Sequence, residues 1–194
     1  MQTIRLETSN TFSIHDFSSA NVVETEQLAD HLTTLFGGAK IRKILLVNPP
    51  DVQEALFDYD IAKRGRANNY PTYGLGVIAK HLINNGYDAK ICNLNHELLK
   101  NVASSESGVG FDYTSNWKGI LFDAINEHQP DLIGITCIFS VTGPSLTDVC
   151  KACKEFEPSW RADGSKVPVA IGGVHVTHDL QETMGGIPEA DFAF

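Results

Sequence analysis

Short apolar runs rich in β-branched residues recur along the chain, and segments with helical periodicity separate them. The runs lie at residues 43–47, 89–94, 131–137, 167–171 and 190–194. Continuous runs of this length and composition are typical of strands buried on both faces of a parallel sheet. Strands that alternate with helices form right-handed crossovers, so the pattern predicts an α/β fold with one parallel sheet.

The strand order follows from the number of strands and crossovers. Five strands with helices between them favour the Rossmann-like, flavodoxin-like order 2-1-3-4-5, with helices on both faces. Ligands of such folds bind outside the carboxyl ends of the strands, near the point where the strand order reverses. We therefore expect a site beyond strands one, three and four.

Two segments carry apolar residues at the i, i+3, i+4, i+7, i+8 spacing of an amphipathic helix. These residues are Leu75, Ile78, Ala79, Leu82 and Ile83 in the first segment, and Trp117, Ile120, Leu121, Ala124 and Ile125 in the second. Further helices are expected at residues 144–156, with a proline in the first turn, and in short pieces at 96–100 and 180–184. Residues 51–73 show little periodicity and predict a long loop, a kind of segment that is often functional.

Residues 1–40 differ in character from the rest of the chain. Asn21 and Glu24 resemble a capping box, and an apolar helical face follows and stops at Gly37-Gly38. We predict an N-terminal extension over residues 1–40 and one domain over residues 41–194. Because the sequence ends on a predicted core strand, we expect that domain to be a fragment of a longer enzyme.

Composition excludes several classes of partner. The net charge is −9, and the absence of any Lys/Arg cluster argues against nucleic acid and anionic membranes. No apolar run reaches the ~18 residues of a membrane span, and no signal peptide is evident, so a cytoplasmic protein is expected. Cys150 and Cys153 share a helical face with Leu146 and Val149. We interpret these cysteines as core residues and not as a redox or zinc pair.

The run at 167–171 ends abruptly at Gly172-Gly173. Glycine at the end of a strand permits a positive φ and lets another group approach the backbone closely. Polar residues follow, among them His175 and Thr177, and would lie at the mouth of the sheet. Two interpretations stay open at this point: a ligand site, or a tight strand-to-helix turn with Thr177 as the helix N-cap.

Three common ligands of this fold class are disfavoured by local sequence. A phospho-acceptor domain needs acidic residues after strand one, where this chain has Asn48-Pro49-Pro50. A dinucleotide Gly-x-Gly-x-x-Gly motif is absent, because Gly74 and Gly76 follow a long loop and lack a third glycine. A flavodoxin would carry a Ser/Thr/Gly-rich phosphate loop directly after strand one, and this chain does not.

An ordered series of segments resembles the N-terminal cobalamin-binding domain of cobalamin-dependent radical S-adenosylmethionine enzymes. The segments are residues 43–50 (KILLVNPP), 70–76 (YPTYGLG), 130–136 (PDLIGIT), 172–177 (GGVHVT) and 188–192 (PEADF). The resemblance covers about residues 43–194 and implies a Rossmann-like domain that holds a corrinoid over its sheet edge. The nucleotide tail of the cofactor would lie beside strands three and four.

The resemblance also implies a set of cofactor-binding residues. Positions beside the tail are Ser140, Thr142, Gly172 and Gly173, and positions near the corrin face are Asn48, Pro49, Tyr70, Gly74 and Leu75. His175 and Thr177 complete the expected set. For His175 we favour a local hydrogen bond that orders the turn over a bond to cobalt.

Two departures limit what this chain is expected to do. It lacks the Asp-x-His-x-x-Gly motif with which cobalamin mutases ligate cobalt, so no catalytic or metal-ligating residue is expected. It also lacks Cys-x-x-x-Cys-x-x-Cys, so the 4Fe-4S cluster and S-adenosylmethionine would bind to a C-terminal radical domain of the parent enzyme. The chain alone should lack radical chemistry, and would position the corrinoid for methyl transfer or a related reaction. The alternative is a flavodoxin-like nucleotide-binding or protein-interaction module without a corrinoid.

Overall fold

The computed structural model describes residues 30, 33 and 40–194, and residues 41–194 form one unit of the chain. The helical face predicted between residues 21 and 36 lies outside the described residues, apart from residues 30 and 33. The unit contains a five-stranded parallel sheet in the order β2-β1-β3-β4-β5, which confirms the predicted fold class and strand order. The strands are β1 (Lys43–Asn48), β2 (Asp88–Asn93), β3 (Leu132–Thr136), β4 (Val169–Gly172) and β5 (Phe192–Ala193).

The longer helices are α3 (Tyr73–Asn84), α4 (Leu94–Ser104), α5 (Tyr113–His128) and α6 (Gly143–Glu155). The short ones are η1 (Glu54–Leu56), α2 (Tyr59–Lys63), η2 (Ser140–Thr142), α7 (Val174–His178) and α8 (Leu180–Gly186). Residues 51–73, expected as a loop, therefore contain η1 and α2. The predicted piece at 96–100 is part of the longer α4, which begins at the end of β2 because the Asn93 side chain accepts a hydrogen bond from the His96 amide.

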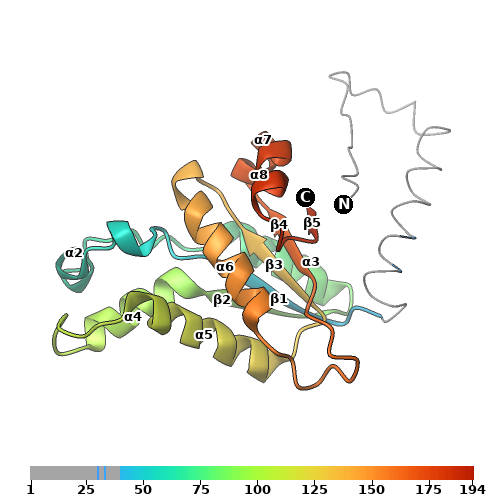
Figure 1. Ribbon diagram of the computed structural model, residues 1–194, viewed down its shortest axis with the longest axis horizontal. Coiled ribbons are helices and arrows are strands. Elements are labelled where there is room, and N and C mark those ends of the chain that lie inside the picture. The colour runs from blue at the N-terminus through green and yellow to red at the C-terminus, as the bar shows by residue number, and fades with distance from the viewer. Residues whose placement is uncertain (1–29, 31–32, 34–39) are drawn as a thin grey trace. The chain divides into compact units, whose positions relative to one another are not determined.

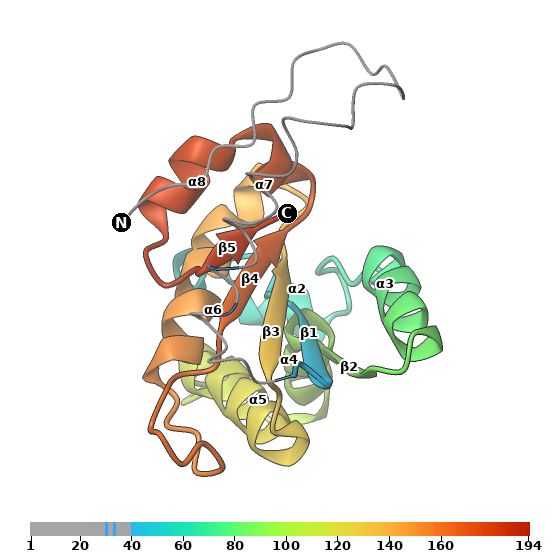
Figure 2. The same cartoon turned by 90° about the vertical axis from the view of Figure 1, so that its right-hand side faces the viewer.

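Within the described part of the chain, one face of the sheet is thickly covered and the other is thinly covered. Helices α4, α5 and α6 lie in front of the sheet in Figure 1, and with it they enclose the main core. Helix α3 lies on the opposite side, as Figure 2 shows, and its Leu75 and Ala79 pack on Ile44 and Leu46 of β1. The thinly covered face is therefore the one on which α3 lies.

The two predicted helical faces differ in how much of each is buried. In α5 the predicted face is buried or half-buried throughout, with Trp117, Leu121 and Ile125 in the core. In α3 only Leu75 and Ala79 are buried, whereas Ile78 and Ile83 are each 49% exposed, which corrects the prediction of a broad inward face. The cause is position, because α3 covers a small cluster over β1 and contacts the sheet along a narrow stripe.

The amino edge of the sheet is held by two aspartates. Asp131 accepts hydrogen bonds from the backbone N–H groups of Arg42 (2.7 Å) and Lys43 (2.9 Å), just before β1. Asp191 accepts one from the Val169 amide at the start of β4 and forms an ion pair with Lys154, both at 2.6 Å. Each carboxylate joins neighbouring strands where they begin, so these residues stabilise the sheet at the edge opposite the expected site.

The cysteines are core residues, as predicted. Cys150 and Cys153 are buried and unpaired, and burial raises the pKa of the Cys150 thiol to about 12. A thiol with so high a pKa is protonated at neutral pH and is a poor nucleophile. Separately, no helix in the described part of the chain is long and apolar enough to cross a membrane.

Candidate functional site at the carboxyl edge of the sheet

The strands β1, β3 and β4 end side by side, and the segments after them form one edge. Thr136 of β3 is paired with Gly172 of β4, and Asn48 of β1 with Asn93 of β2. The residues expected to bind a cofactor lie in or beside the segments that leave these strand ends. The topology therefore brings them to a common edge of the sheet.

Gly173 is glycine because the fold requires it. Its φ is +112°, and a Cβ at this position would lie 2.4 Å from the carbonyl oxygen of Cys137. Two backbone hydrogen bonds join the segments after β3 and β4 at this point. The Cys137 amide donates to the Gly172 carbonyl (2.7 Å), and the His175 amide donates to the Cys137 carbonyl (3.2 Å). A side chain at Gly173 would collide with this junction before it could reach a ligand.

Gly172 has a different environment. Among the described residues, a Cβ added to Gly172 would meet the backbone oxygen of Phe194 at 3.6 Å and the Phe194 Cβ at 3.8 Å, which are ordinary contacts. The backbone of β4 would accept a side chain here, so internal packing does not explain the glycine. A side chain at this position would instead occupy the face of the sheet on which α3 lies.

Four residues of β3 and β4 form a strip on that face, and none is larger than threonine: Gly134, Thr136, Ala170 and Gly172. We call them the small-residue strip. Alternate residues of a strand point to one face, and Gly134 lies next to Leu46, which belongs to the α3 cluster. The strip is therefore on the opposite side of the sheet from the main core. Thr136 was not anticipated from the sequence, and its hydroxyl forms no hydrogen bond among the described residues.

The predicted hydroxyl residues have separate roles. The buried Thr142 hydroxyl donates to the Phe139 carbonyl (2.7 Å) and lies 3.1 Å from the Cys137 sulfur, so it is committed to the turn after β3. The exposed Ser140 hydroxyl lies 3.2 Å from Nδ1 of His175. This contact joins the segments after β3 and β4 and agrees with the local ordering role favoured for His175.

Thr177 lies in the last turn of α7 and is not its N-cap, because the helix already begins after Gly173. Its hydroxyl lies within hydrogen-bond distance of the Gly173 carbonyl (3.1 Å) and the Phe194 carbonyl (3.4 Å). The N-cap interpretation of Thr177 is wrong, because the chain turns into a helix directly at the glycine.

The end of β1 is held in place by asparagines. Asn48 donates to Asn93 Oδ1 (3.1 Å) and to the carbonyl of Pro49 (3.2 Å), and Pro49 is buried. Asn95, which the sequence analysis missed, is buried; it accepts from the Asp51 amide (3.1 Å) and donates to the Asn68 carbonyl (2.8 Å). Through these two hydrogen bonds, Asn95 holds the first and last residues of the segment 51–68 beside the start of α4.

Of the five residues expected near a corrin face, Tyr70 and Gly74 are exposed, Asn48 is half-buried, and Pro49 and Leu75 are buried. The Tyr70 side chain is exposed, and a Cβ on Gly74 would meet no described residue within 4 Å. The Leu75 side chain is buried against β1, so only its backbone is positioned near the edge.

Large apolar side chains are exposed around this edge, on the segments that follow β1, β3 and β4. They are Tyr70, Tyr73, Ile138, Phe139, Val141 and Val174, and we call them the apolar rim. Exposed apolar groups in one region of a soluble protein commonly mark a binding surface. Asp51 is a polar exception on the segment after β1, and burial raises the pKa of its carboxyl group. No cluster of three metal-ligating side chains occurs among the described residues.

Comparison with known proteins identifies the family. Residues 60–194 match the family model of the B12 binding domain. The chain belongs to the B12 binding domain family. The strand order and the carboxyl-edge site agree with a cofactor-binding role, and the family argues against the alternative of a module without a corrinoid.

Similarity to other proteins is limited. No curated protein matches the chain. A crystal structure of a novel cobalamin-binding protein from Desulfitobacterium hafniense DCB-2 is similar, with 18% identity and a TM-score of 0.39, over 87% of this chain. The chain spans 60% of the length of that protein.

The exposed residues of this B12 binding domain fit the chemistry of cobalamin. A corrin ring is broad and largely apolar, and the apolar rim offers it several aromatic and aliphatic side chains. The small-residue strip leaves the floor beside the rim without bulky side chains. No histidine lies between β1 and α3, so that segment has no imidazole to offer as a ligand to cobalt.

Proposed function

We propose that the domain holds cobalamin with the corrin ring over the carboxyl ends of β1, β3 and β4 and the nucleotide tail along the small-residue strip. The observation that carries this proposal is Gly172, a glycine that packing within the described part of the chain does not require. It lies where the strip meets the apolar rim. A flat ligand would gain contact with backbone there that any larger residue would prevent.

The binding residues divide by location. Asn48, Tyr70 and Gly74 would face the corrin ring, and the buried Pro49 and Leu75 would hold the backbone beside it in place. Ser140, Thr142, Gly172, Gly173, His175 and Thr177 would form or support the tail site. Thr136 joins the second group, because its hydroxyl has no hydrogen-bond partner among the described residues and lies on the strip next to Gly172.

We further propose that residues 41–194 serve as the cofactor domain of a cobalamin-dependent radical S-adenosylmethionine enzyme, with residues 1–40 as an extension. The 4Fe-4S cluster and S-adenosylmethionine would belong to a C-terminal radical domain, and the enzyme would be cytoplasmic. Bound cobalamin would supply the cobalt that carries a methyl group. This domain would orient the corrinoid and shield one face of the corrin ring from water, and the opposite face of the ring would be open to the partner domain.

Reconstitution tests the proposed site. The domain is mixed with hydroxocobalamin, desalted, and examined by visible absorption for retained cofactor. Gly172→Leu should abolish retention, because the side chain would fill the strip. Gly119→Leu is the matched control, since Gly119 lies on α5 with nothing within 4 Å of an added Cβ, and it should retain cobalamin like the wild type. Equal retention by both variants would remove the strip from the binding site.

A further inference from the structure

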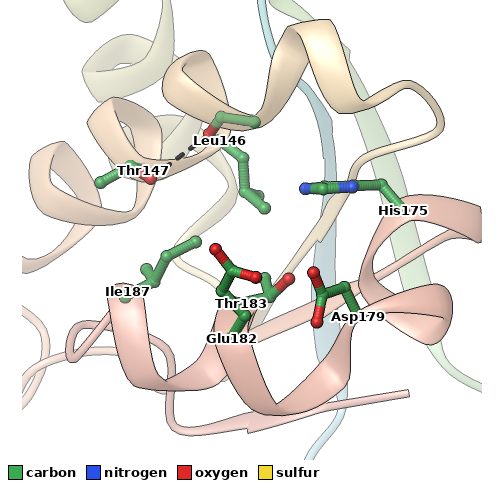
Figure 3. Close-up of a pocket in the computed structure, with 9 residues that line it drawn as sticks. Leu146, Thr147, His175, Asp179, Glu182, Thr183 and Ile187 are labelled. Carbon is green, nitrogen blue, oxygen red and sulfur yellow. Dashed lines mark hydrogen bonds between the residues drawn. The ribbon is translucent and has the colours of Figure 1, made fainter.

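The two sides of the proposed cofactor site are held in place by different contacts. On the tail side, Figure 3 shows the His175 ring beside the start of α6, and its Nδ1 atom lies 3.2 Å from the Ser140 hydroxyl. That contact is confined to the segments after β3 and β4. On the ring side, Tyr70 follows a segment that leaves β1 and is fastened to α4 through Asn95.

Asn95 is an amide on an otherwise apolar buried face of α4, and it is 6% exposed. The neighbouring buried residues of this helix are Leu94, Leu98 and Val102. Burial of an amide costs free energy unless the amide is hydrogen-bonded. Both side-chain hydrogen bonds of Asn95 are made with the backbone of the segment 51–68, at the Asp51 amide and the Asn68 carbonyl. The side chain is therefore committed to holding that segment.

The two ends of the segment differ in what else holds them. Near the first end, the Tyr113 hydroxyl donates to the Val52 carbonyl, which provides a second anchor. At the other end, beyond α2, the described residues add a contact between the side chains of Asn69 and His96 (3.2 Å), and this contact is exposed. Loss of the Asn95 amide would therefore release the second end more than the first.

The second end lies next to a residue proposed to face the corrin ring. Tyr70 follows Asn68 by two residues, and two residues of extended chain reach at most about 7 Å. The Tyr70 side chain is 67% exposed, so packing around it does little to fix its place. The position of Tyr70 depends instead on the backbone that Asn95 holds.

We infer that Asn95 is a positioning residue for the corrin ring, one that keeps the Tyr70 end of the segment in the binding conformation before the cofactor arrives. The inference rests on the proposed function, because it concerns the same site. It is distinct from the tail site, since Asn95 follows β2 and the small-residue strip lies on β3 and β4. If about a tenth of the molecules kept the binding conformation without Asn95, the apparent affinity would fall about tenfold.

The test measures the affinities of the protein for hydroxocobalamin and for cobinamide, which lacks the nucleotide tail, by equilibrium dialysis. Asn95→Leu preserves the size of the side chain and removes both hydrogen bonds, so it should weaken both compounds by the same factor of about ten. Asn101→Leu is the matched control, because Asn101 lies on the same helix and donates to Asn116 of α5 (3.2 Å). This control should bind both compounds like the wild type, and circular dichroism verifies that each variant is folded.

Asn95→Asp supplies a readout that a packing role alone would not move. An ionised carboxylate can accept from the Asp51 amide but cannot donate to the Asn68 carbonyl, whereas the protonated acid can do both. Burial raises a carboxyl pKa above its ordinary value of about 4. The affinity of this variant relative to the wild type should therefore be low at about pH 8 and recover as the pH falls to about 5.

The outcomes separate this inference from the proposed function. A wild-type protein that binds no cobalamin would overturn the proposed function, and this inference with it. If the wild type binds cobalamin, this inference alone would be overturned by unchanged affinities in Asn95→Leu or by an equal loss in Asn101→Leu. A loss in Asn95→Asp that is the same at every pH would also overturn it.

Discussion

Replacing Gly173 by alanine would place a methyl carbon 2.4 Å from the carbonyl oxygen of Cys137, at a φ of +112°. Such a backbone conformation costs a non-glycine residue about 1–3 kcal/mol by itself. The clash is with backbone that joins β3 to β4, so relief requires the junction to move and adds to this cost. We expect Gly173→Ala to lower the free energy of unfolding by about 3 kcal/mol or more.

The adjacent Gly172→Ala is the matched control, because its Cβ would make only an ordinary contact at 3.6 Å. Glycine within a strand is unfavourable, so this variant should unfold within about 1 kcal/mol of the wild type or be slightly more stable. Urea unfolding followed by circular dichroism measures both. Similar destabilisation by the two substitutions would refute the assignment of one glycine to the fold and the other to the ligand.

Three other predictions follow from single contacts. Asp131→Ala should cost about 2 kcal/mol in urea unfolding, because two backbone N–H groups before β1 lose their acceptor, whereas Asp123→Ala should cost almost nothing. Burial raises the pKa of the Asp51 carboxyl group, so the ionised carboxylate destabilises the folded state. This loss of stability is absent below the pKa that Asp51 has in the unfolded chain, and it is complete once the pH has risen through the raised pKa of the folded state. Asp51→Asn should therefore be more stable than the wild type at neutral pH and equal to it in acid; the opposite pH trend would contradict this. For cobalt(II) cobalamin bound to the domain, electron paramagnetic resonance should show no nitrogen triplet splitting, and a triplet lost in His175→Ala would make that histidine a ligand.

The fold was predictable because each crossover leaves a local pattern. The apolar runs at β1, β3 and β4 and the periodicity of α5 are strong enough to identify a parallel sheet. The buried face of α3 was harder to predict. Ile78 and Ile83 match the helical periodicity, but they lie beside the narrow stripe through which α3 contacts the sheet, and both remain half exposed. Periodicity identifies a helix, and only the packing shows how much of it is buried.

The site was predictable in position and less so in detail. The Gly172-Gly173 pair lies at the carboxyl end of β4, where the candidate site was expected, yet a sequence cannot show which glycine has a positive φ. Asn95 was missed, although an Asn-x-Asn pattern directly after a strand could have indicated capping and anchoring.

The central claim is that the cofactor's nucleotide tail lies along the strip that ends at Gly172. Cobinamide has the corrin ring of cobalamin without the nucleotide tail, so comparing the two affinities isolates the tail site. We predict that the domain binds cobalamin at least about tenfold more tightly than cobinamide, and that Gly172→Leu abolishes the difference. Equal affinities for cobalamin and cobinamide in the wild-type domain would contradict the account.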